Sequence, residues 1–332
     1  MDENAPTFDD HGSVGLHPVE TDRAVITTRG LNATATAVNQ IVQNMDPGAI
    51  LYGNPRVGKT EACLFLLLNA SRLFGSAIPG ALHSCSEAEQ SRTTDNKFFT
   101  GLLISLSYGA PSSGTAVDKL RRLTNLIVER AQRAREFRFL LFVDEAHWLQ
   151  DVQLTFLMDL YNQVNRRGVK MITFLVGGPK LLEKKTSLAE EHQTQLTHRF
   201  MVSTVLHEGI LDLSDFRRFC RGFDRGQDWP VGSGRCFTEH FVPLAHAGGW
   251  RLEEEAGKIW NTMLAERRHL GDPEEGELPL QALMSMMRWL LQHLREHDVA
   301  GLTLDRGTIE TAYRRTAAAQ VSEHLRLPSI LQ

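Results

Sequence analysis

Eight consecutive residues, Gly53 to Thr60, read GNPRVGKT and follow the short apolar run Ala49-Ile50-Leu51-Tyr52. The spacing G-x-x-x-x-G-K-[ST] is that of a phosphate-binding loop, which needs a strand before it and a helix after it. Its glycines let successive backbone N–H groups point inward as an anion nest, at the positive end of the next helix. The residues that we predict to bind a nucleoside triphosphate are Gly53, Asn54, Pro55, Arg56, Val57, Gly58, Lys59, Thr60 and Glu61.

The last two residues of the pattern have distinct chemical roles. Lys59 would reach the β- and γ-phosphates, and the Thr60 hydroxyl would hold Mg²⁺. The alternative is a glycine-rich turn that precedes a helix by chance, which the full pattern in this context disfavours. The sequence therefore predicts ATP and Mg²⁺ as the ligands of this loop.

A pair of carboxylates follows a second apolar run, Phe139-Leu140-Leu141-Phe142-Val143. Such a continuous run is typical of a strand buried on both faces of a parallel sheet, and ligands gather at the carboxyl ends of these strands. We expect Asp144 to orient Mg²⁺ through its water shell and Glu145 to polarise the attacking water. The alternative, a helix cap, is disfavoured by the phosphate-binding loop upstream. For His147, which completes a DEAH spelling also found in helicases, we expect only a cap or a contact with the next loop.

The elements that must position these residues alternate along the chain. We predict a parallel sheet wrapped by helices on both faces, followed by helices only. The predicted strands are 49–53, 79–84, 139–143, 169–176 and 200–205. The predicted helices are 31–45, 59–74, 94–107, 117–135, 152–165 and 179–195, and then 212–223, 236–247, 251–267 and 280–297.

This order predicts an α/β AAA+ P-loop NTPase with a small all-α lid. Residues 1–45 would form an N-terminal arm and a leading helix, with 1–30 flexible or bound to a partner, and 46–206 the nucleotide-binding core. Residues 207–270 would form the helical lid. Residues 271–332 would form a linker that opens with the acidic stretch GDPEEGE and a short helical C-terminal extension.

Two arginines fit the AAA+ arrangement as catalytic residues beside Glu145. Arg199 precedes the last strand and could act in trans on a neighbour's γ-phosphate, an effect worth ~10³–10⁵ in rate. The alternative for Arg199 is a surface ion pair. Arg251 opens a lid helix after Gly248-Gly249-Trp250, as a second sensor of the γ-phosphate does. Where a polar first sensor is usual, the chain has Gly177-Gly178, and Thr173 lies inside the predicted strand.

The composition is that of an ordinary globular protein, with 42% hydrophobic residues, 23% charged residues and a net charge of −4 over 332 residues. Any DNA contact must therefore use a local basic patch. The four cysteines (Cys63, Cys85, Cys220 and Cys236) include no CxxC pair, so we expect buried thiols and neither a disulfide frame nor a zinc site. Neither a secretory leader nor a membrane-spanning run is apparent, which favours a bacterial cytoplasmic protein without membrane partners.

The chain resembles the TnsC/TniB family of AAA+ transposition regulators. The resemblance runs from about residue 31 to residue 260. Family members assemble in an ATP-dependent manner into rings or filaments around duplex DNA. They connect a target-selection protein of the TniQ/TnsD type, in some systems part of a CRISPR-associated RNA-guided complex, to the transposase. In this family a polar residue, often Gln, stands where the chain has Gly178. The resemblance is carried by KFFTGLL (97–103), LRRLTNLIVERA (120–131), LLFVDEAHWL (140–149), YNQVNRRGVKMITFLVGGP (161–179), HRFMV (198–202), HEGI (207–210) and TEHFVPLAHAGGWRL (238–252).

A basic edge of the predicted helix 117–135 is the candidate DNA surface. It would follow phosphates of double-stranded DNA without reading bases, because no sequence-reading motif is present. A solvated helix face is the alternative. The candidate DNA-binding residues are Arg92, Lys97, Lys119, Arg121, Arg122 and Arg130.

Three other functions stay open from the sequence. A replication-initiator or loader ATPase would share the lid and the second sensor. A DEAH helicase would need a second RecA-like domain, for which the remaining chain is too short and too helical. A scaffold that binds ATP with little hydrolysis is favoured by the absence of a polar first sensor at Gly177-Gly178.

Overall fold

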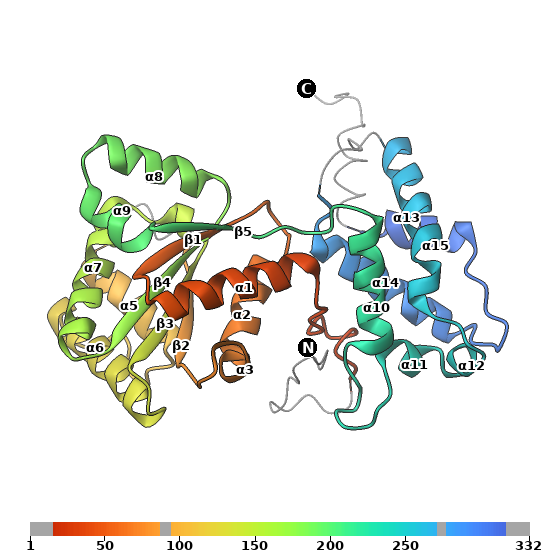
Figure 1. Ribbon diagram of the computed structural model, residues 1–332, viewed down its shortest axis with the longest axis horizontal. Helices are drawn as coiled ribbons and strands as arrows, with labels where there is room; N and C mark the ends of the chain where they lie inside the picture. Colours follow the sequence, from red (N-terminus) through yellow and green to blue (C-terminus); the bar gives the residue numbers. More distant parts are fainter. Residues whose placement is uncertain (1–15, 87–93, 271–276, 317–332) are drawn as a thin grey trace. The chain divides into compact units, whose positions relative to one another are not determined.

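The computed structural model describes residues 16–86, 94–270 and 277–316, which form two compact units (Figure 1). The sheet unit comprises Ala33–Pro55 and Lys59–His207. The helical unit comprises the described residues before Ala33, the short segment Arg56–Gly58 and the described chain from Glu208 onward. No helix in these ranges is both long and apolar enough to cross a membrane.

The sheet unit is built on five parallel strands in the order β2-β3-β4-β1-β5. This confirms the predicted parallel α/β fold and all five predicted strands, with shifts of a few residues at their ends. The largest shift is at β5, which begins after the predicted start because a helix occupies the chain as far as Phe200. The strands are β1 (Gly48–Tyr52), β2 (Gly80–Ser84), β3 (Arg138–Asp144), β4 (Lys170–Gly177) and β5 (Ser203–Leu206).

Both faces of the sheet carry a hydrophobic core, which explains why the central strands are apolar throughout. Along β3, Phe139, Leu141 and Val143 enter one core, whereas Leu140 and Phe142 enter the other. Successive side chains of a strand point to opposite faces, so a strand covered on both sides has no polar face. Helices lie on both faces of the sheet (Figure 1).

The helices of the sheet unit depart from the predicted ones at two breaks. The predicted helix 59–74 is interrupted at Asn69, whose side chain donates a hydrogen bond to Phe65 O (2.8 Å). The predicted helix 179–195 ends at Glu190, and a separate helix begins at Thr194. The helices are α1 (Arg29–Asn44), α2 (Lys59–Leu68), α3 (Ala70–Phe74), α5 (Asp95–Ser105), α6 (Ala116–Arg133), α7 (Asp151–Arg166), α8 (Lys180–Glu190) and α9 (Thr194–Phe200), with a 3₁₀ turn at Ala146–Trp148.

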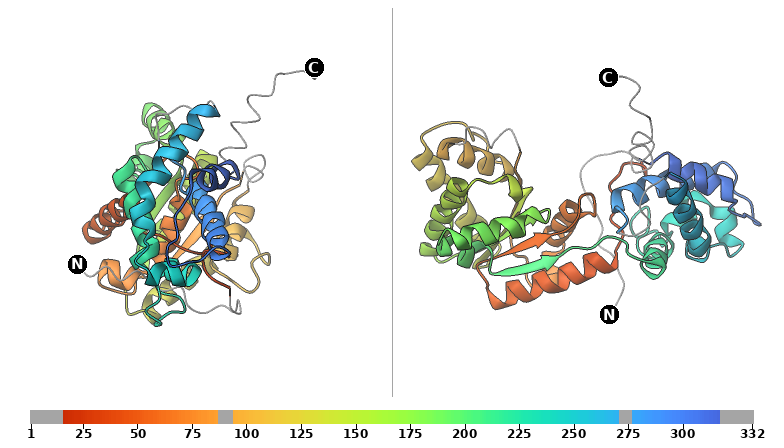
Figure 2. Two further views of the ribbon diagram at one scale, coloured as in Figure 1. Left: turned by 90° about the vertical axis from the view of Figure 1, so that its right-hand side faces the viewer. Right: turned by 90° about the horizontal axis from the view of Figure 1, so that it is seen from above.

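The helical unit has one continuous hydrophobic core (Figure 2). Residues of the predicted lid, such as Phe216 and Ile259, share this core with Met287 and Ile309 from the predicted extension. The predicted helix 236–247 is two short helices, because Pro243 has no N–H to continue the first one. The helices are α10 (Leu213–Arg225), α11 (Phe237–Phe241), α12 (Pro243–Ala247), α13 (Leu252–His269), α14 (Leu280–Arg295) and α15 (Arg306–Arg314), the last not predicted. Most of the acidic stretch lies outside the described residues.

The prediction of a flexible or partner-bound arm over residues 1–30 is wrong for the part that the structure describes. Val19 and Ile26 are buried in the core of the helical unit, and His17 is 1% exposed. The His17 ring stacks on His240 (4.4 Å between centroids) and meets the Phe237 ring edge-on. Apolar contact therefore holds this stretch. Residues 1–15 lie outside the described part of the chain.

Candidate nucleotide-binding site

The phosphate-binding loop joins β1 to α2, as the sequence predicts. The Gly53 N–H donates to Gly177 O (3.2 Å), which ties the end of β1 to the end of β4. Arg56 (φ 63°) and Gly58 (φ 97°) both have left-handed backbone conformations, which let the loop curl. The buried Lys59 ammonium donates to Gly53 O (3.0 Å) and Asn54 O (2.7 Å). The lysine therefore spans the inside of the loop, where phosphates would bind.

Thr60 and Asp144 meet at the carboxyl edge of the sheet. The Thr60 hydroxyl donates to Asp144 Oδ2 at 2.5 Å, and Asp144 Oδ1 accepts from the Glu145 N–H (2.9 Å). Asp144 is the last residue of β3 and is buried. A hydroxyl and a carboxylate side by side are the hard oxygen donors that Mg²⁺ prefers. The residues present therefore fit the predicted ion.

Glu145 has an unusual backbone for a non-glycine residue. Its φ of 51° and ψ of 35° place it in the left-handed region, which costs of order 1–3 kcal/mol in a residue with a Cβ. Its side chain is half exposed, and its Oε2 lies 3.2 Å from His147 Nδ1. The fold thus turns Glu145 away from the strand direction and places its carboxylate beside an imidazole.

His147 lies closer to this site than we expected from the sequence. A Cβ added to Gly177, the last residue of β4, would lie 3.2 Å from His147 Nδ1. The imidazole therefore takes up space that any side chain at position 177 would need. A polar group is thus supplied to Glu145 by His147, from the turn after β3, and the sequence signal for it was the pairing of this histidine with glycines after β4.

The two other candidates for a first sensor contribute no polar side chain. A Cβ added to Gly178 would meet no heavy atom within 4 Å among the described residues, so a longer side chain would fit there. Thr173 is fully buried in the middle of β4, and its hydroxyl has no hydrogen-bond partner within the described part of the chain. Thr173 is enclosed by the sheet.

Arg199 lies on α9 and is held against α7. Its Nη1 donates to Asn162 Oδ1 (3.1 Å), and its guanidinium lies 4.4 Å from the centre of the Tyr161 ring. Both partners are uncharged, so Arg199 keeps its full positive charge while its side chain is oriented. The position precedes β5, as the sequence indicated.

Arg251 is the residue before α13 in the helical unit. Its Nη1 donates to two backbone oxygens, His246 O (2.8 Å) and Trp250 O (2.7 Å). The buried carboxylate of Asp224 accepts from the Leu252 and Glu253 N–H groups and so caps α13 in place of Arg251. Burial raises the pKa of Asp224, although these hydrogen bonds oppose the rise. Arg251 is therefore placed at a firmly capped helix start.

The expected exposed basic edge of α6 does not include Lys119, and that expectation is wrong. Lys119 is 2% exposed, and its ammonium donates to Asn96 Oδ1 (2.5 Å) and Thr100 Oγ1 (2.7 Å) of α5. Arg130 is partly buried, and its Nη2 donates to Leu106 O (2.5 Å). Desolvation lowers the pKa of Arg130. Both side chains link α6 to α5 or to the turn that follows it.

The remaining basic candidates lie nearer the solvent. Lys97 is exposed at the start of α5. Arg121 forms an ion pair with Asp118 (3.2 Å), and Arg122 Nη1 donates to Ser113 O (2.5 Å). Arg92 lies outside the described residues.

The sheet order, the phosphate-binding loop and the Asp-Glu pair after β3 define a P-loop NTPase of the AAA+ class. Residues 46–184 match a family model described as an AAA domain. No curated protein matches the chain.

Solved structures with a similar fold include AAA+ proteins of archaea. The ORC2 protein of Aeropyrum pernix, solved in ADPNP–ADP complexes, matches with a TM-score of 0.59 at 11% identity, over 91% of this chain and 72% of that chain. Cdc6p from Pyrobaculum aerophilum matches with a TM-score of 0.42 at 13% identity, over 90% and 83%. The Walker-type ATPase PABY2304 of Pyrococcus abyssi matches with a TM-score of 0.41 at 16% identity, over 89% of each chain. At this identity the ORC2 likeness shows the fold.

Proposed function

We propose that this chain binds ATP with Mg²⁺ and hydrolyses it slowly to ADP and phosphate. The observation that carries the proposal is the Thr60–Asp144 contact, with Lys59 inside the loop and Glu145 next along the chain. These groups supply a cation for the phosphates, oxygen ligands for an ion and a carboxylate for a water molecule. When bound, the ion would neutralise phosphate charge.

Glu145 is the group that separates hydrolysis from binding alone. Its carboxylate would accept a proton from the water whose oxygen attacks the γ-phosphorus, while the bond from that phosphorus to the β–γ bridging oxygen breaks. His147 Nδ1, 3.2 Å from Glu145 Oε2, would keep that carboxylate in one orientation. We assign His147 as a positioning residue, since it lies beside the catalytic carboxylate.

Arg199 would complete the site of a neighbouring subunit. Its guanidinium is oriented by Tyr161 and Asn162 and paired with no acid among the described residues. A preoriented, unneutralised arginine is suited to stabilise charge on a transferred phosphoryl group. ATP would then hold two subunits together, and Arg251 would link nucleotide state to the helical unit.

The biological setting that we propose is DNA transposition. The support is the resemblance to the TnsC/TniB regulators, which extends over both the predicted core and the predicted lid. The protein would assemble as a ring or filament on double-stranded DNA and connect a TniQ/TnsD-type target-selection protein to the transposase. Its DNA surface would use Lys97 and Arg121, which are exposed, with Arg122 and Arg92 beside them, and would exclude the buried Lys119.

The substitution Glu145→Gln tests this function. The variant keeps the size and hydrogen-bonding shape of the side chain but cannot take up a proton, so we expect ATP binding and assembly on DNA to persist. Turnover should fall by about 10²–10⁴-fold, the usual contribution of a general base. Turnover at the wild-type rate would contradict the assignment of Glu145. Binding without measurable turnover in the wild type would instead favour an ATP-binding scaffold.

A replication-initiator or loader ATPase is the second candidate function. The position of Arg251 at the start of α13 favours it, because this class also carries an arginine at the start of a lid helix. The two candidates differ in DNA specificity. An initiator would prefer particular origin sequences, whereas the transposition regulator should bind unrelated duplexes equally well.

A further inference from the structure

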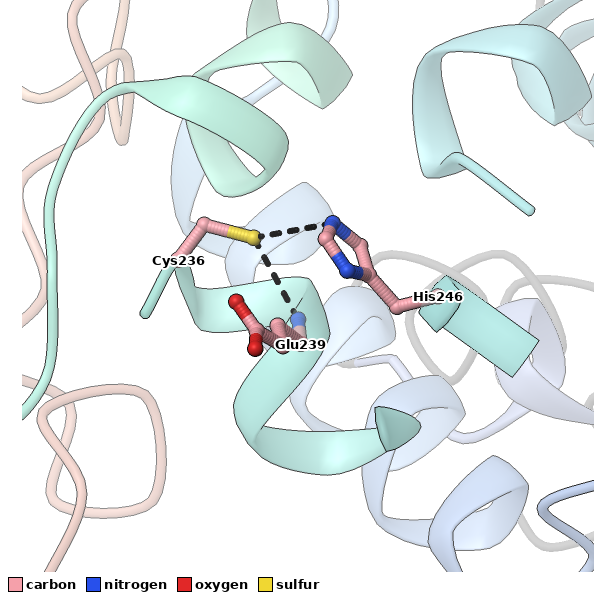
Figure 3. A group of neighbouring side chains, drawn as sticks. All are labelled: Cys236, Glu239 and His246. Atoms are coloured by element: carbon pink, nitrogen blue, oxygen red, sulfur yellow. Dashed lines mark hydrogen bonds between the residues drawn. The ribbon is translucent and has the colours of Figure 1, made fainter. Parts of the chain in front are cut away.

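Three side chains with metal-binding atoms converge in the helical unit (Figure 3). They are Cys236 before α11, Glu239 in the first turn of α11 and His246 on α12. One ligand atom from each lies within 4.8 Å of the other two. The closest pair is Cys236 Sγ and His246 Nε2, at 3.5 Å.

The sulfur-to-nitrogen distance is the one that a tetrahedral zinc site requires. With a Zn–S bond of about 2.3 Å and a Zn–N bond of about 2.0–2.1 Å, a tetrahedral angle places the two atoms about 3.6 Å apart. Cys236 and His246 therefore have the ligand spacing already. The Glu239 carboxylate would complete three ligands after a movement of roughly 1 Å, which a glutamate side chain can make by rotation.

The backbone around these residues is organised to hold them. The Glu239 N–H donates to Cys236 Sγ (3.3 Å), so a sulfur occupies the N-cap position where an oxygen-bearing side chain is usual. The chain turns at Val242-Pro243, and α12 then returns His246 towards α11. Cys236 is buried, whereas Glu239 and His246 are partly exposed, so an ion could enter from the solvent.

We propose that Cys236, Glu239 and His246 bind one divalent cation of the zinc type, with a fourth position left to water. A thiolate and an imidazole favour zinc and similar borderline metals and disfavour magnesium. The site is thus chemically distinct from the oxygen pair Thr60–Asp144. It also revises the expectation that the absence of CxxC pairs excludes a zinc site, because its ligands follow the unfamiliar spacing C-x₂-E-x₆-H.

The burial of Cys236 agrees with a thiol that needs a cation to ionise. Burial, with Asp224 and Glu239 nearby, raises the pKa of the Cys236 thiol. A bound cation reverses this balance, because a coordinating thiol is deprotonated outright. Binding should therefore release a proton.

The ion would also brace the residue that contacts Arg251. His246 offers its ring to the metal and its carbonyl oxygen to Arg251 Nη1 (2.8 Å). Holding the ring of His246 limits the movement of the short helix α12, and with it the carbonyl that orients Arg251. This consequence rests on the proposed role of Arg251, whereas the metal site itself does not.

A cobalt titration of the metal-stripped full-length chain tests the site. Co²⁺ bound to a thiolate gives a ligand-to-metal charge-transfer absorption, which carboxylates and imidazoles alone do not give. We expect this band in the wild type and its loss in Cys236→Ser. In His246→Gln we expect affinity at least about 100-fold weaker, because even outer-shell changes cost about 10- to 100-fold. No charge-transfer band in the wild type, or a full band in Cys236→Ser, would overturn the proposal.

A second group, His293, Glu296 and His297 near the end of α14, supplies the matched control. It has no thiol, so the double variant His293→Gln/His297→Gln should keep the band and its affinity. A second measurement needs no variant: Zn²⁺ should slow alkylation of Cys236, followed by mass spectrometry, at least about tenfold in the wild-type chain. Alkylation unaffected by Zn²⁺ would count against the site. Nucleotide binding, measured in the same metal-stripped sample, reports on Lys59 independently, so failure of one proposal does not imply failure of the other.

Discussion

Thr60 and Asp144 are separated by 84 positions in the chain, yet the Thr60 hydroxyl donates a 2.5 Å hydrogen bond to Asp144 Oδ2. The contact joins the first turn of α2 to the last residue of β3. Parallel strands end at one edge of the sheet, which is why residues so far apart in sequence can meet there. This edge brings the phosphate-binding loop and the carboxylates into one site.

Replacing Lys59 with alanine should abolish nucleotide binding. The Lys59 ammonium lies inside the loop, on Gly53 O and Asn54 O, where it would meet phosphate oxygens. A hydrogen bond to a charged group contributes about 1.5–3 kcal/mol, so we expect affinity for a fluorescent ATP analogue to fall at least about tenfold. Lys59→Arg is the control for charge. Unchanged affinity in Lys59→Ala would place the nucleotide elsewhere.

Replacing His147 should lower turnover more than it weakens substrate binding. Without the imidazole beside Glu145 Oε2, the catalytic carboxylate loses one orienting neighbour, and such a displacement can cost up to about 100-fold in rate. We expect kcat to fall in His147→Ala with KM nearly unchanged, and partial rescue in His147→Gln. A large rise in KM with unchanged kcat would show that His147 contributes to binding instead.

Adding a methyl group at Gly177 should disturb the same pair from the opposite side. A Cβ there would lie 3.2 Å from His147 Nδ1 and 3.0 Å from Leu181 Cδ1, so both side chains would have to move. We expect Gly177→Ala to reduce turnover, while Gly178→Ala, at a position with open space, leaves it within about twofold. Equal losses in both variants would contradict this account of His147.

Arg199→Ala should lose hydrolysis without losing ATP binding, because Arg199 is proposed to act on a neighbour. An arginine supplied in this way is worth ~10³–10⁵ in rate. Mixing Arg199→Ala with Lys59→Ala should restore part of the activity, since the first retains an intact loop and the second retains Arg199. If the mixture is as inactive as each variant alone, Arg199 does not act between subunits.

The helical unit should lose stability as the pH is lowered from about 6.5. Burial, together with His240 and Arg295, lowers the pKa of His17 from 6.5 to about 3. Between these values the unfolded chain binds a proton that the folded chain does not, so the free energy of unfolding falls by up to about 1.4 kcal/mol per pH unit. Urea unfolding at pH 7 and pH 5 should show this loss, and His17→Phe should reduce it. An equal pH dependence in both proteins would contradict the assignment.

The sequence alone predicted the parts of the molecule whose signals are local. The loop 53–60 has a fixed spacing, and strands such as β3 are apolar throughout because helices cover both faces. These features located the edge of the sheet and named Thr60, Asp144 and Glu145 before the contacts were known. Their agreement reflects neighbouring residues that determine one another's structure.

Other features depend on partners distant in sequence, which no local pattern reveals. Lys119 looked like part of a basic surface, but Asn96 and Thr100 of α5 draw its ammonium into the interior. His17 looked like part of a polar arm until Phe237 and His240 enclosed it. The Cys236 cluster has ligands on two helices, and the turn at Pro243 that unites them was predicted as continuous helix.

The central claim is that ATP at shared sites controls assembly on DNA. Sedimentation of the purified chain with duplexes of unrelated sequence, with and without magnesium and a non-hydrolysable ATP analogue, tests it most directly. The account predicts large DNA-bound assemblies only when nucleotide is present, for every duplex, and none with Lys59→Ala. A protein that remains monomeric and unbound to DNA at saturating magnesium nucleotide would contradict it.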